Sequence, residues 1–481
     1  MQTRRLLRMI PALLAATVVV GCGAGSGQSA GSSQSAGSGQ SAGSSQSAGS
    51  GQSAGSDDTS SCSIAEQRRE IFDFMFEWYF FNDEPEQQQK YDGLNLNDFP
   101  TAEILLSFLR YRPSEFDRGF SFLTTTAADD QFFGEGQFVG FGFGSKFVNS
   151  PLNADLRLTQ LFPDSPATLA GFRRGQRIVA IDGRTIAEIN SAEGVTAALG
   201  ANEIGITRTF LIRNPDGSDF EVLVAKALVT IDPVVTTAIF DVAGAKVGYL
   251  DFRTFISTAN DQLDVAFAEF ESQNVTALVV DVRYNGGGLV STAELLADLI
   301  GGVIANGQVL SKTRFNAAKS AFNEFELFRQ RPSSLSLLLH VVFITTGSSA
   351  SASELVINAL FPHTVVTLVG STTFGKPVGQ SGFGYCDDEL LLRAVTFETV
   401  NALDEGRYFD GLNVTCNAAD ELAFVIGDPA EASLAAALQY IETGTCGPVA
   451  FQSKLVAPTI PYQDLSRDPG APAAQRLLGA Y

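Results

Sequence analysis

Residues 347–380, GSSASASELVINALFPHTVVTLVGSTTFGKPVGQ, decide the fold that this sequence predicts. The apolar run LSLLLHVVFITT at 335–346 precedes them and is typical of a buried strand, and TVVTLVG at 364–370 predicts a second strand after a helical stretch. Strand, helix and strand in this order form a βαβ crossover of a parallel sheet. The helix start at Ser351 and the turn at Lys376 should therefore lie at one edge of that sheet.

A hydroxyl and an amine at one sheet edge suggest a hydrolase with a Ser/Lys dyad. Ser351 needs a base to remove its proton. Lys376 serves as that base only when neutral, so its pKa must fall from about 10.4 towards the working pH, which surrounding apolar strands would favour. Gln380 is placed to orient the amine or to hold substrate. The alternative is that Ser351 and Glu354 form only a helix capping box and that Lys376 is an exposed turn residue.

A glycine-rich loop supplies a candidate oxyanion hole. YNGGG at 284–288 follows a predicted strand, TALVVDVR at 276–283, and precedes a predicted helix at 291–300. Each glycine loses much conformational entropy on folding, and a plain turn does not require three of them in a row. We therefore expect another group to approach the backbone of this loop closely. We expect the backbone N–H groups of Gly287 and Ala352 to bind an oxyanion, where losing one donor costs on the order of 3 kcal/mol.

Other chemistries are disfavoured by the residues present. The chain has two histidines, His340 in the apolar run and His363 at a helix end, and both favour structural roles over a Ser-His-Asp triad. There is no HExxH motif or paired histidine spacing, so we expect no metal and no cofactor. The formal net charge of −21 argues against nucleic acid as a partner, since phosphate binding needs clustered Lys and Arg.

The stretch from Phe138 to about Ala227 has short alternating strands and glycine turns. It contains VGFGFG at 139–144 and DSPATLAGFRRGQRIVAIDGRTI at 164–186, and in these two motifs it resembles a PDZ domain. Gln176 departs from the aspartate that the family often has there. The resemblance implies a backbone loop that receives the C-terminal carboxylate of a peptide beside a strand edge. That loop is formed by Gly140, Phe141, Gly142 and Phe143.

The N-terminus predicts export and lipid anchoring. Arg4, Arg5 and Arg8 precede an apolar stretch at 9–20 that is too short to span a bilayer, and Cys22 follows at the position of a lipoprotein acylation site. An ordinary secretory signal is the alternative. Five repeats of GSGQSA or GSSQSA at 25–54 form a flexible tether, so we expect an exported protein held to a membrane in the cell envelope.

Outside the core, the pattern predicts a helical module and a closing segment. Ser63 and Glu66 form a capping box at the start of a predicted helix, and 101–111 is a second predicted helix. One face of the first helix carries Ile64, Ile71, Met75 and Trp78. The loop DRGFSFL at 117–123 favours a structural role. Residues 406–416 predict a closing strand pair, and 428–446 a final helix. The predicted divisions are a signal peptide (1–21), a linker (22–61), a helical module (62–135), a PDZ-like domain (136–228), a catalytic α/β core (229–455) and a tail (456–481).

Four cysteines follow Cys22, which in an exported chain favours two disulfides with three possible pairings. We favour Cys386 with Cys416 and Cys62 with Cys446.

The segments together resemble the C-terminal processing, or tail-specific, proteases. The matching motifs are the PDZ-like segment, YNGGG, SASASE at 349–354, and TFGK at 373–376 followed by Gln380. The resemblance implies an α/β multidomain fold with a crotonase- or ClpP-like core, Ser351 as nucleophile, Lys376 as general base and Gln380 in support. Pro377 replaces a usual glycine, and an insertion is expected around 313–338.

The resemblance further implies an endopeptidase that recognises the free C-terminus of a polypeptide and cleaves upstream. Two alternatives remain open from the sequence. One is a non-catalytic, PDZ-type peptide-binding lipoprotein on a degenerate protease fold, and the other is a hydrolase of small esters that uses the same dyad.

Overall fold

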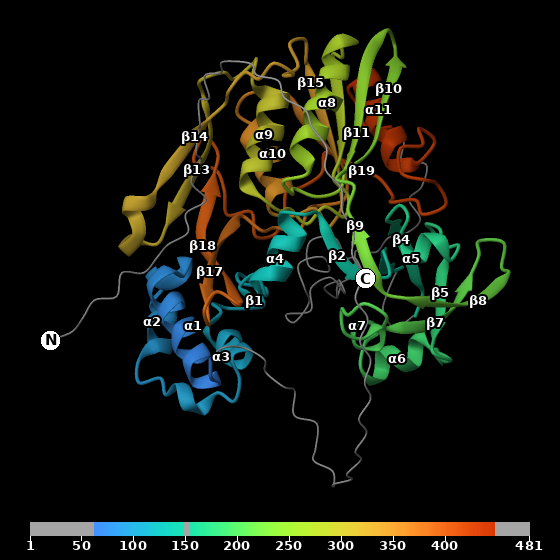
Figure 1. The fold of residues 1–481 in the computed structure, drawn as a ribbon. Coiled ribbons are helices and arrows are strands. Elements are labelled where there is room, and N and C mark those ends of the chain that lie inside the picture. The colour runs from blue at the N-terminus through green and yellow to red at the C-terminus, as the bar shows by residue number, and fades with distance from the viewer. Residues whose placement is uncertain (1–61, 149–153, 448–481) are drawn as a thin grey trace, which may run out of the picture. The chain divides into compact units, whose positions relative to one another are not determined.

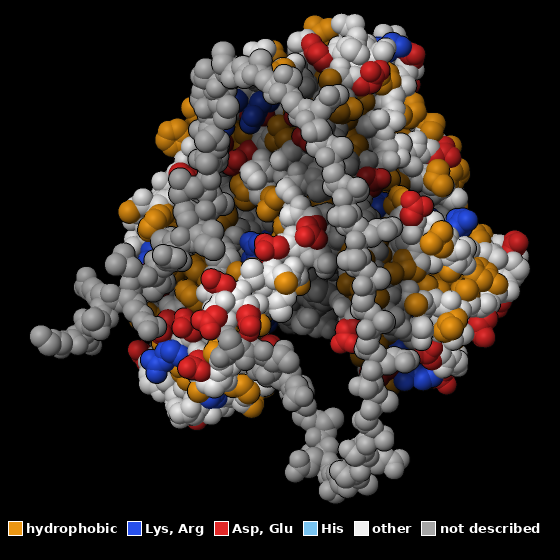
Figure 2. All heavy atoms as spheres, in the orientation of Figure 1, with side chains coloured by type: hydrophobic (Ala, Val, Ile, Leu, Met, Phe, Trp, Pro, Cys, Tyr) orange, Lys and Arg blue, Asp and Glu red, His pale blue; other side chains and the backbone are white. Residues whose placement is uncertain are grey.

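The computed structural model describes residues 62–148 and 154–447. The predicted signal peptide, Cys22, the repeat linker and the tail at 456–481 lie outside the described residues. Within the described part of the chain, no helix is both long and apolar enough to cross a bilayer. Acidic side chains are spread over the face drawn in Figure 2, as the negative net charge of the sequence leads one to expect.

A six-stranded sheet forms the centre of the α/β part (Figure 1). Its first two strands pair antiparallel, and every later pair is parallel. The carboxyl ends of the parallel strands therefore share one edge, as the crossover at 335–370 predicts, although the strand expected from 335 begins only at His340. In spatial order the strands are β10 (Val234–Val242), β11 (Ala245–Phe252), β12 (Ala277–Asp281), β15 (His340–Thr345), β16 (Val366–Gly370) and β19 (Cys416–Asn417).

Helices cover both faces of this sheet (Figure 1). In β12, Leu278 and Val280 pack with the helices of one face, while Val279 packs with the single helix of the other. This alternation within an apolar strand is what burial on both faces requires. The first face carries α8 (Ala259–Ser272), α9 (Val290–Gly301) and α10 (Ala352–Leu360), and the second carries α11 (Ala432–Thr443), the final helix predicted within 428–446.

The segment at 137–230, called here the β-rich segment, has the short strands and glycine turns that its sequence predicts. Its main sheet has the order β3-β4-β5-β7-β8, so β3 is an edge strand. The elements are β2 (Gln137–Gly140), β3 (Phe143–Phe147), β4 (Leu156–Leu161), α5 (Pro166–Leu169), β5 (Arg177–Ile181), β6 (Arg184–Thr185), α6 (Ile186–Ala192), α7 (Val195–Leu199), β7 (Thr207–Arg213), β8 (Asp219–Ala225) and β9 (Ala227–Thr230).

The N-terminal module consists mainly of helices. Its first helix begins with the Ser63–Glu66 capping box, and Ile71, Met75 and Trp78 are buried. Ile64, the first residue of the same helical face, is 41% exposed. The elements are α1 (Ile64–Trp78), η1 (Phe80–Asp83), α2 (Pro85–Tyr91), η2 (Leu96–Asp98), α3 (Ala102–Leu109), β1 (Phe122–Thr125) and α4 (Thr126–Phe133).

A second sheet joins this module to the α/β part. Its longest strand, β18, pairs with β1, β13 and β17. The strands are β13 (Val309–Phe315), β14 (Glu324–Leu327), β17 (Val378–Tyr385) and β18 (Leu390–Val400), with the short helix η4 (Ala317–Phe322) between β13 and β14. The predicted strand pair at 406–416 is wrong. Residues 406–411 instead pack as a turn, where a Cβ atom on Gly411 would lie 2.2 Å from the carbonyl oxygen of Thr373.

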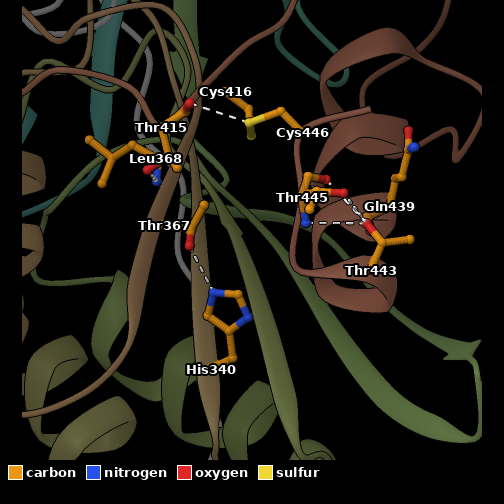
Figure 3. Close-up of a disulfide and its surroundings, with 9 residues drawn as sticks. All are labelled: His340, Thr367, Leu368, Thr415, Cys416, Gln439, Thr443, Thr445 and Cys446. Atoms are coloured by element: carbon orange, nitrogen blue, oxygen red, sulfur yellow. Dashed lines mark hydrogen bonds between the residues drawn. A yellow bond between two sulfur atoms is a disulfide. The ribbon is translucent and has the colours of Figure 1, made fainter. Parts of the chain in front are cut away.

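Two disulfides among the described residues join Cys62 to Cys386 and Cys416 to Cys446, so the favoured pairing is wrong. Cys416 lies in β19, and the end of α11 brings Cys446 beside it, with Cα atoms 5.5 Å apart (Figure 3). Cys62 precedes α1, which packs on the β17–β18 hairpin that carries Cys386; the rings of Phe74 and Phe383 are 4.8 Å apart. Packing of these elements, which the cysteine spacing does not encode, sets the pairing.

Candidate active site

Three segments predicted to meet do so at the carboxyl edge of the central sheet: the glycine loop (284–288), the serine segment (346–353) and the lysine turn (373–377). The N–H of Ala350 donates to the carbonyl of Asn285 at 3.0 Å, which joins the first two segments. The N–H of Phe374 donates to the carbonyl of Ser349 at 2.9 Å, which joins the second and third. Backbone hydrogen bonds thus fix the relative positions of all three segments.

Ser351 has a strained backbone at the start of α10, with φ of 55° and ψ of −113°. A non-glycine residue keeps such a conformation only where its surroundings impose it. Here the hydroxyl of Ser353 donates to the carbonyl of Asn285 at 3.0 Å, and that of Ser349 donates to the carbonyl of Val282 at 2.7 Å. The next residue, Ala352, opens the helix, so its N–H has no acceptor within the helix.

Gly287 approaches the serine segment as closely as the glycine run suggested. Its φ is 107°, and a Cβ atom there would lie 2.8 Å from the Cβ of Ser351 and 2.9 Å from the nitrogen of Ala352. Its N–H donates to Oδ1 of Asn285 at 3.0 Å. This donor therefore reaches an oxyanion only by leaving that side chain.

We expect Gly287→Ala to abolish activity while Gly171→Ala leaves it intact. Both glycines have a positive φ, at 107° and 92°, so both substitutions strain the backbone. A Cβ atom on Gly171 meets nothing within 4 Å, whereas one on Gly287 must displace the start of α10. Steady-state kinetics of the two variants, with thermal unfolding as a check on folding, measure this difference. Equal activity in both variants would show that catalysis does not require Gly287 to lie so close to Ser351.

Lys376 lies at the end of the lysine turn and is 8% exposed. Its Nζ donates to Oε1 of Gln380 at 2.6 Å, and Nε2 of Gln380 in turn donates to the carbonyl of Phe120. Lys376 and Gln380 are thus brought together as expected. The contact from Phe120, in the loop at 117–123, places a part of the N-terminal module at the site.

Glu354, which the sequence predicts only as part of a helix capping box, has more partners in the structure. Its side chain is fully buried and accepts four hydrogen bonds, from the N–H groups of Ser351 (2.9 Å), Gly375 (2.7 Å) and Lys376 (2.8 Å) and from the hydroxyl of Thr373 (2.5 Å). Burial raises the pKa of this carboxyl group, and the hydrogen bonds partly oppose that effect. One carboxylate thus holds the backbones of both the serine and the lysine.

The sequence contained one signal for this role. The helix ASELVINAL is apolar on nearly all sides, and every residue of α10 is buried. A carboxylate in such a helix needs internal partners.

Both histidines lie away from the site. His340 begins β15, a strand whose rise to Thr345 at the site edge is about 17 Å. His363 follows the far end of α10, a helix about 13 Å long. Their side chains hydrogen-bond to Thr367 and to the carbonyl of Val309. This agrees with the structural roles favoured from the sequence.

The GFGF motif forms the connection between β2 and β3. The rings of Phe141 and Phe143 are fully buried in the core of the β-rich segment, so only the backbone of this loop is available to a ligand. Gly142 has a φ of 87°, and a Cβ atom there would lie 2.1 Å from that of Ser165. Gln176, the departure from the family pattern, still closes its turn, because its Oε1 accepts from the N–H of Arg173 at 2.7 Å.

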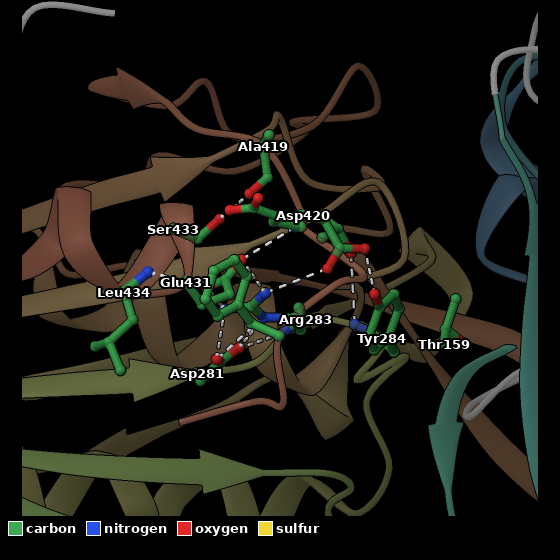
Figure 4. A network of polar contacts seen from close by, with 12 residues as sticks. Thr159, Asp281, Arg283, Tyr284, Ala419, Asp420, Glu431, Ser433 and Leu434 are labelled. Carbon is green, nitrogen blue, oxygen red and sulfur yellow. Dashed lines mark hydrogen bonds and ion pairs between the residues drawn. The ribbon is translucent and has the colours of Figure 1, made fainter. Parts of the chain in front are cut away.

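A buried charge network lies next to the glycine loop (Figure 4). Arg283 is paired with Asp281, Asp420 and Glu431. The hydroxyl of Tyr284 donates to Asp420. Burial opposes the ionisation of Asp420, but the neighbouring cations, Lys146 foremost, hold its pKa well below its usual range. The network fixes the residues that lead into the glycine loop.

The network also reaches the β-rich segment. Arg174 pairs with Asp420 at 2.6 Å and donates to the hydroxyl of Tyr284 at 3.0 Å. Lys146, on the edge strand β3, pairs with the same carboxylate. Arg174 thus contacts both Asp420 and Tyr284, the first residue of the glycine loop, and Lys146 contacts Asp420.

Comparison with known proteins agrees with this geometry. Residues 246–415 match the model of Peptidase family S41, a span that includes the glycine loop, Ser351, Lys376 and Gln380. The chain is 27% identical over 258 residues to carboxyl-terminal-processing peptidase 3, chloroplastic, of Arabidopsis thaliana, covering 51% of this chain and 47% of the relative. It is 26% identical over 259 residues to the carboxyl-terminal-processing protease of Synechocystis, covering 54% and 58%. The chain thus spans about half the length of these curated relatives.

Solved structures extend the likeness to most of the described residues. An S41 protease structure from Bacteroides fragilis matches with a TM-score of 0.60 and 25% identity, covering 78% of this chain and 97% of the other. The photosystem II D1 C-terminal processing protease matches with a TM-score of 0.50 and 21% identity over 75% and 94%, which shows the fold alone. Residues 246–415 of the chain are thus similar to Peptidase family S41, and the curated relatives named above are carboxyl-terminal-processing proteases.

Proposed function

We propose that this chain is a serine endopeptidase in which Ser351 is the nucleophile and Lys376 the general base. The observation that carries the proposal is the position of Glu354, whose carboxylate binds the backbone N–H groups of both residues. Lys376 is 8% exposed as a residue, and desolvation disfavours the charged form of an amine. Gln380 orients that amine by accepting a hydrogen bond from it.

In the proposed reaction, Oγ of Ser351 attacks the carbonyl carbon of the scissile peptide bond, and its proton passes to Nζ of Lys376. The N–H of Ala352 and that of Gly287, once it leaves Asn285, stabilise the oxyanion. Collapse of the tetrahedral intermediate breaks the C–N bond, and Lys376 returns the proton to the leaving amine. Water then hydrolyses the acyl-enzyme by the same steps, with Lys376 again as base.

We further propose that the β-rich segment is a PDZ-type dock for the free C-terminus of a polypeptide. Support comes from the backbone loop at 140–143 and from β3, which follows it at the edge of a sheet. An edge strand can pair with an extended peptide, and the preceding loop can bind its carboxylate. The names of the curated relatives, which are carboxyl-terminal-processing proteases, are consistent with such substrates.

The proposed place of action is the cell envelope, with Cys22 as the lipid anchor. Two disulfides among the described residues favour an oxidising compartment. Metabolic labelling of the chain with a radioactive fatty acid tests the anchor. Label on the natural chain that disappears in Cys22→Ser is the expected result, and label that persists in this variant contradicts the assignment.

Substrates with free and amidated C-termini test the proposed function. We expect cleavage of a polypeptide with an apolar free C-terminus, and a KM at least about ten-fold higher when that terminus is amidated, since one charge-assisted contact is worth about 1.4 kcal/mol or more. Equal KM values for the two forms would refute C-terminal docking. Binding without cleavage would favour the peptide-binding protein, and turnover of short acyl esters alone would favour the small-ester hydrolase.

A further inference from the structure

The loop at 117–121 of the N-terminal module lies against the lysine turn. Its conformation is fixed by Asp117, which is fully buried. This carboxylate accepts from the hydroxyl of Tyr79 at 2.7 Å, and from the N–H and the hydroxyl of Ser121 at 2.9 and 2.7 Å. These hydrogen bonds therefore fix the backbone of the loop at the next residue, Arg118.

The guanidinium group of Arg118 donates to three backbone carbonyls, those of Gly375, of Phe374 at 3.1 Å and of Phe409 at 3.2 Å. It also lies 4.2 Å from the centre of the Phe374 ring. The first two carbonyls belong to the peptide groups that lead to Lys376. The N–H groups of these same two peptide groups, on Gly375 and Lys376, donate to Glu354.

Each of these two peptide groups is therefore bound at both ends by a side chain. Arg118 binds the carbonyl oxygens, and Glu354 binds the nitrogens. Hydrogen bonds to charged partners are roughly twice as strong as neutral ones. The hydrogen bonds from Arg118 and to Glu354 lie on either side of Gly375, whose φ is 87°. Without them, the backbone dihedral angles of this glycine would be free to change.

We propose that Arg118 is a positioning residue for the general base. It holds the lysine turn against Glu354 and so fixes the backbone from which the side chain of Lys376 extends. The same loop orients Gln380, because the carbonyl of Phe120 accepts from its Nε2 and leaves Oε1 to face the amine. The N-terminal module thereby completes the active site. Its motif DRGFSFL at 117–123 predicts only a structural role.

This inference rests on the proposed mechanism, and the test separates the two. In Arg118→Ala we expect kcat to fall by about 100-fold with KM unchanged, because misplacing a catalytic group by about 1 Å has an effect of that size. The rate at which a fluorophosphonate labels Ser351 should fall in parallel. Millimolar guanidinium chloride, which fills the space of the missing group, should restore at least a tenth of the lost kcat.

The matched control is Arg112→Ala in the same module, where an exposed arginine pairs with Glu115 at the surface and lies 5.2 Å from the centre of the Phe116 ring. Its kcat should stay within a factor of about two of the natural value. A kcat for Arg118→Ala equal to that of the control overturns the inference, as does a loss that guanidinium does not restore. If the natural chain itself neither cleaves peptides nor reacts with the fluorophosphonate, the proposed function fails instead.

Discussion

Replacing Ser351 with alanine is expected to lower kcat by roughly 10⁶-fold, the loss that removal of the nucleophile causes in a serine protease. The substitution removes one oxygen atom and leaves the hydrogen bonds of the serine segment in place, because these are made by Ser349, Ser353 and backbone groups. The thermal midpoint should therefore change little. Peptide cleavage followed by mass spectrometry measures the loss.

Lys376→Met should show a comparable defect, since it keeps most of the side chain and removes the base. The controls are Ser371→Ala, an exposed serine that follows β16, and Lys312→Met, a lysine paired with Asp404. Both controls should retain natural activity. Full activity in either Ser351→Ala or Lys376→Met would show that the assigned dyad is wrong.

Glu354→Ala is expected to have the second largest effect, on folding as well as on activity. It leaves four donors without their acceptor in a fully buried position. Each buried, unsatisfied group costs about 1–3 kcal/mol, so the free energy of unfolding should fall by at least about 3 kcal/mol. The variant should also lose at least about 100-fold in kcat, because the lysine turn is no longer held to the start of α10. Urea unfolding and steady-state kinetics measure the two effects.

The chain offers a matched control in Glu66→Ala. Glu66 occupies the same capping-box position in α1 and accepts from the N–H of Ser63 at 2.8 Å, but at the solvent-exposed surface. Water replaces the lost acceptor there, so only a small part of the Glu354 effect is expected. Equal destabilisation by the two substitutions would mean that Glu354 acts as a helix cap alone.

The sequence was sufficient to predict the parts of the site that depend on local order. The βαβ pattern at 335–370 places Ser351 and Lys376 at one edge, since parallel strands carry their carboxyl ends together. The three glycines at 286–288 predict that another segment approaches their backbone closely, and Gly287 does lie against Ser351. These inferences needed only periodicity and backbone freedom.

What the sequence left open depends on contacts between distant segments. Arg118 lies more than 250 positions before the carbonyls that it binds, and no spacing rule links them. The capping-box pattern of Glu354 matches that of Glu66, and only burial distinguishes the two. The disulfide pairing likewise follows from the packing of α1 on the β17–β18 hairpin and of α11 beside β19.

The most direct test of the central claim is the site at which an active-site probe becomes attached. The full chain is incubated with a fluorophosphonate, which forms a covalent adduct with an activated serine, and the adduct is located by peptide mass spectrometry. We predict a single adduct on Ser351 that disappears in Lys376→Met. An adduct on another serine, or equal labelling in the Lys376→Met variant, would contradict the assignment of Ser351 and Lys376 as the catalytic pair.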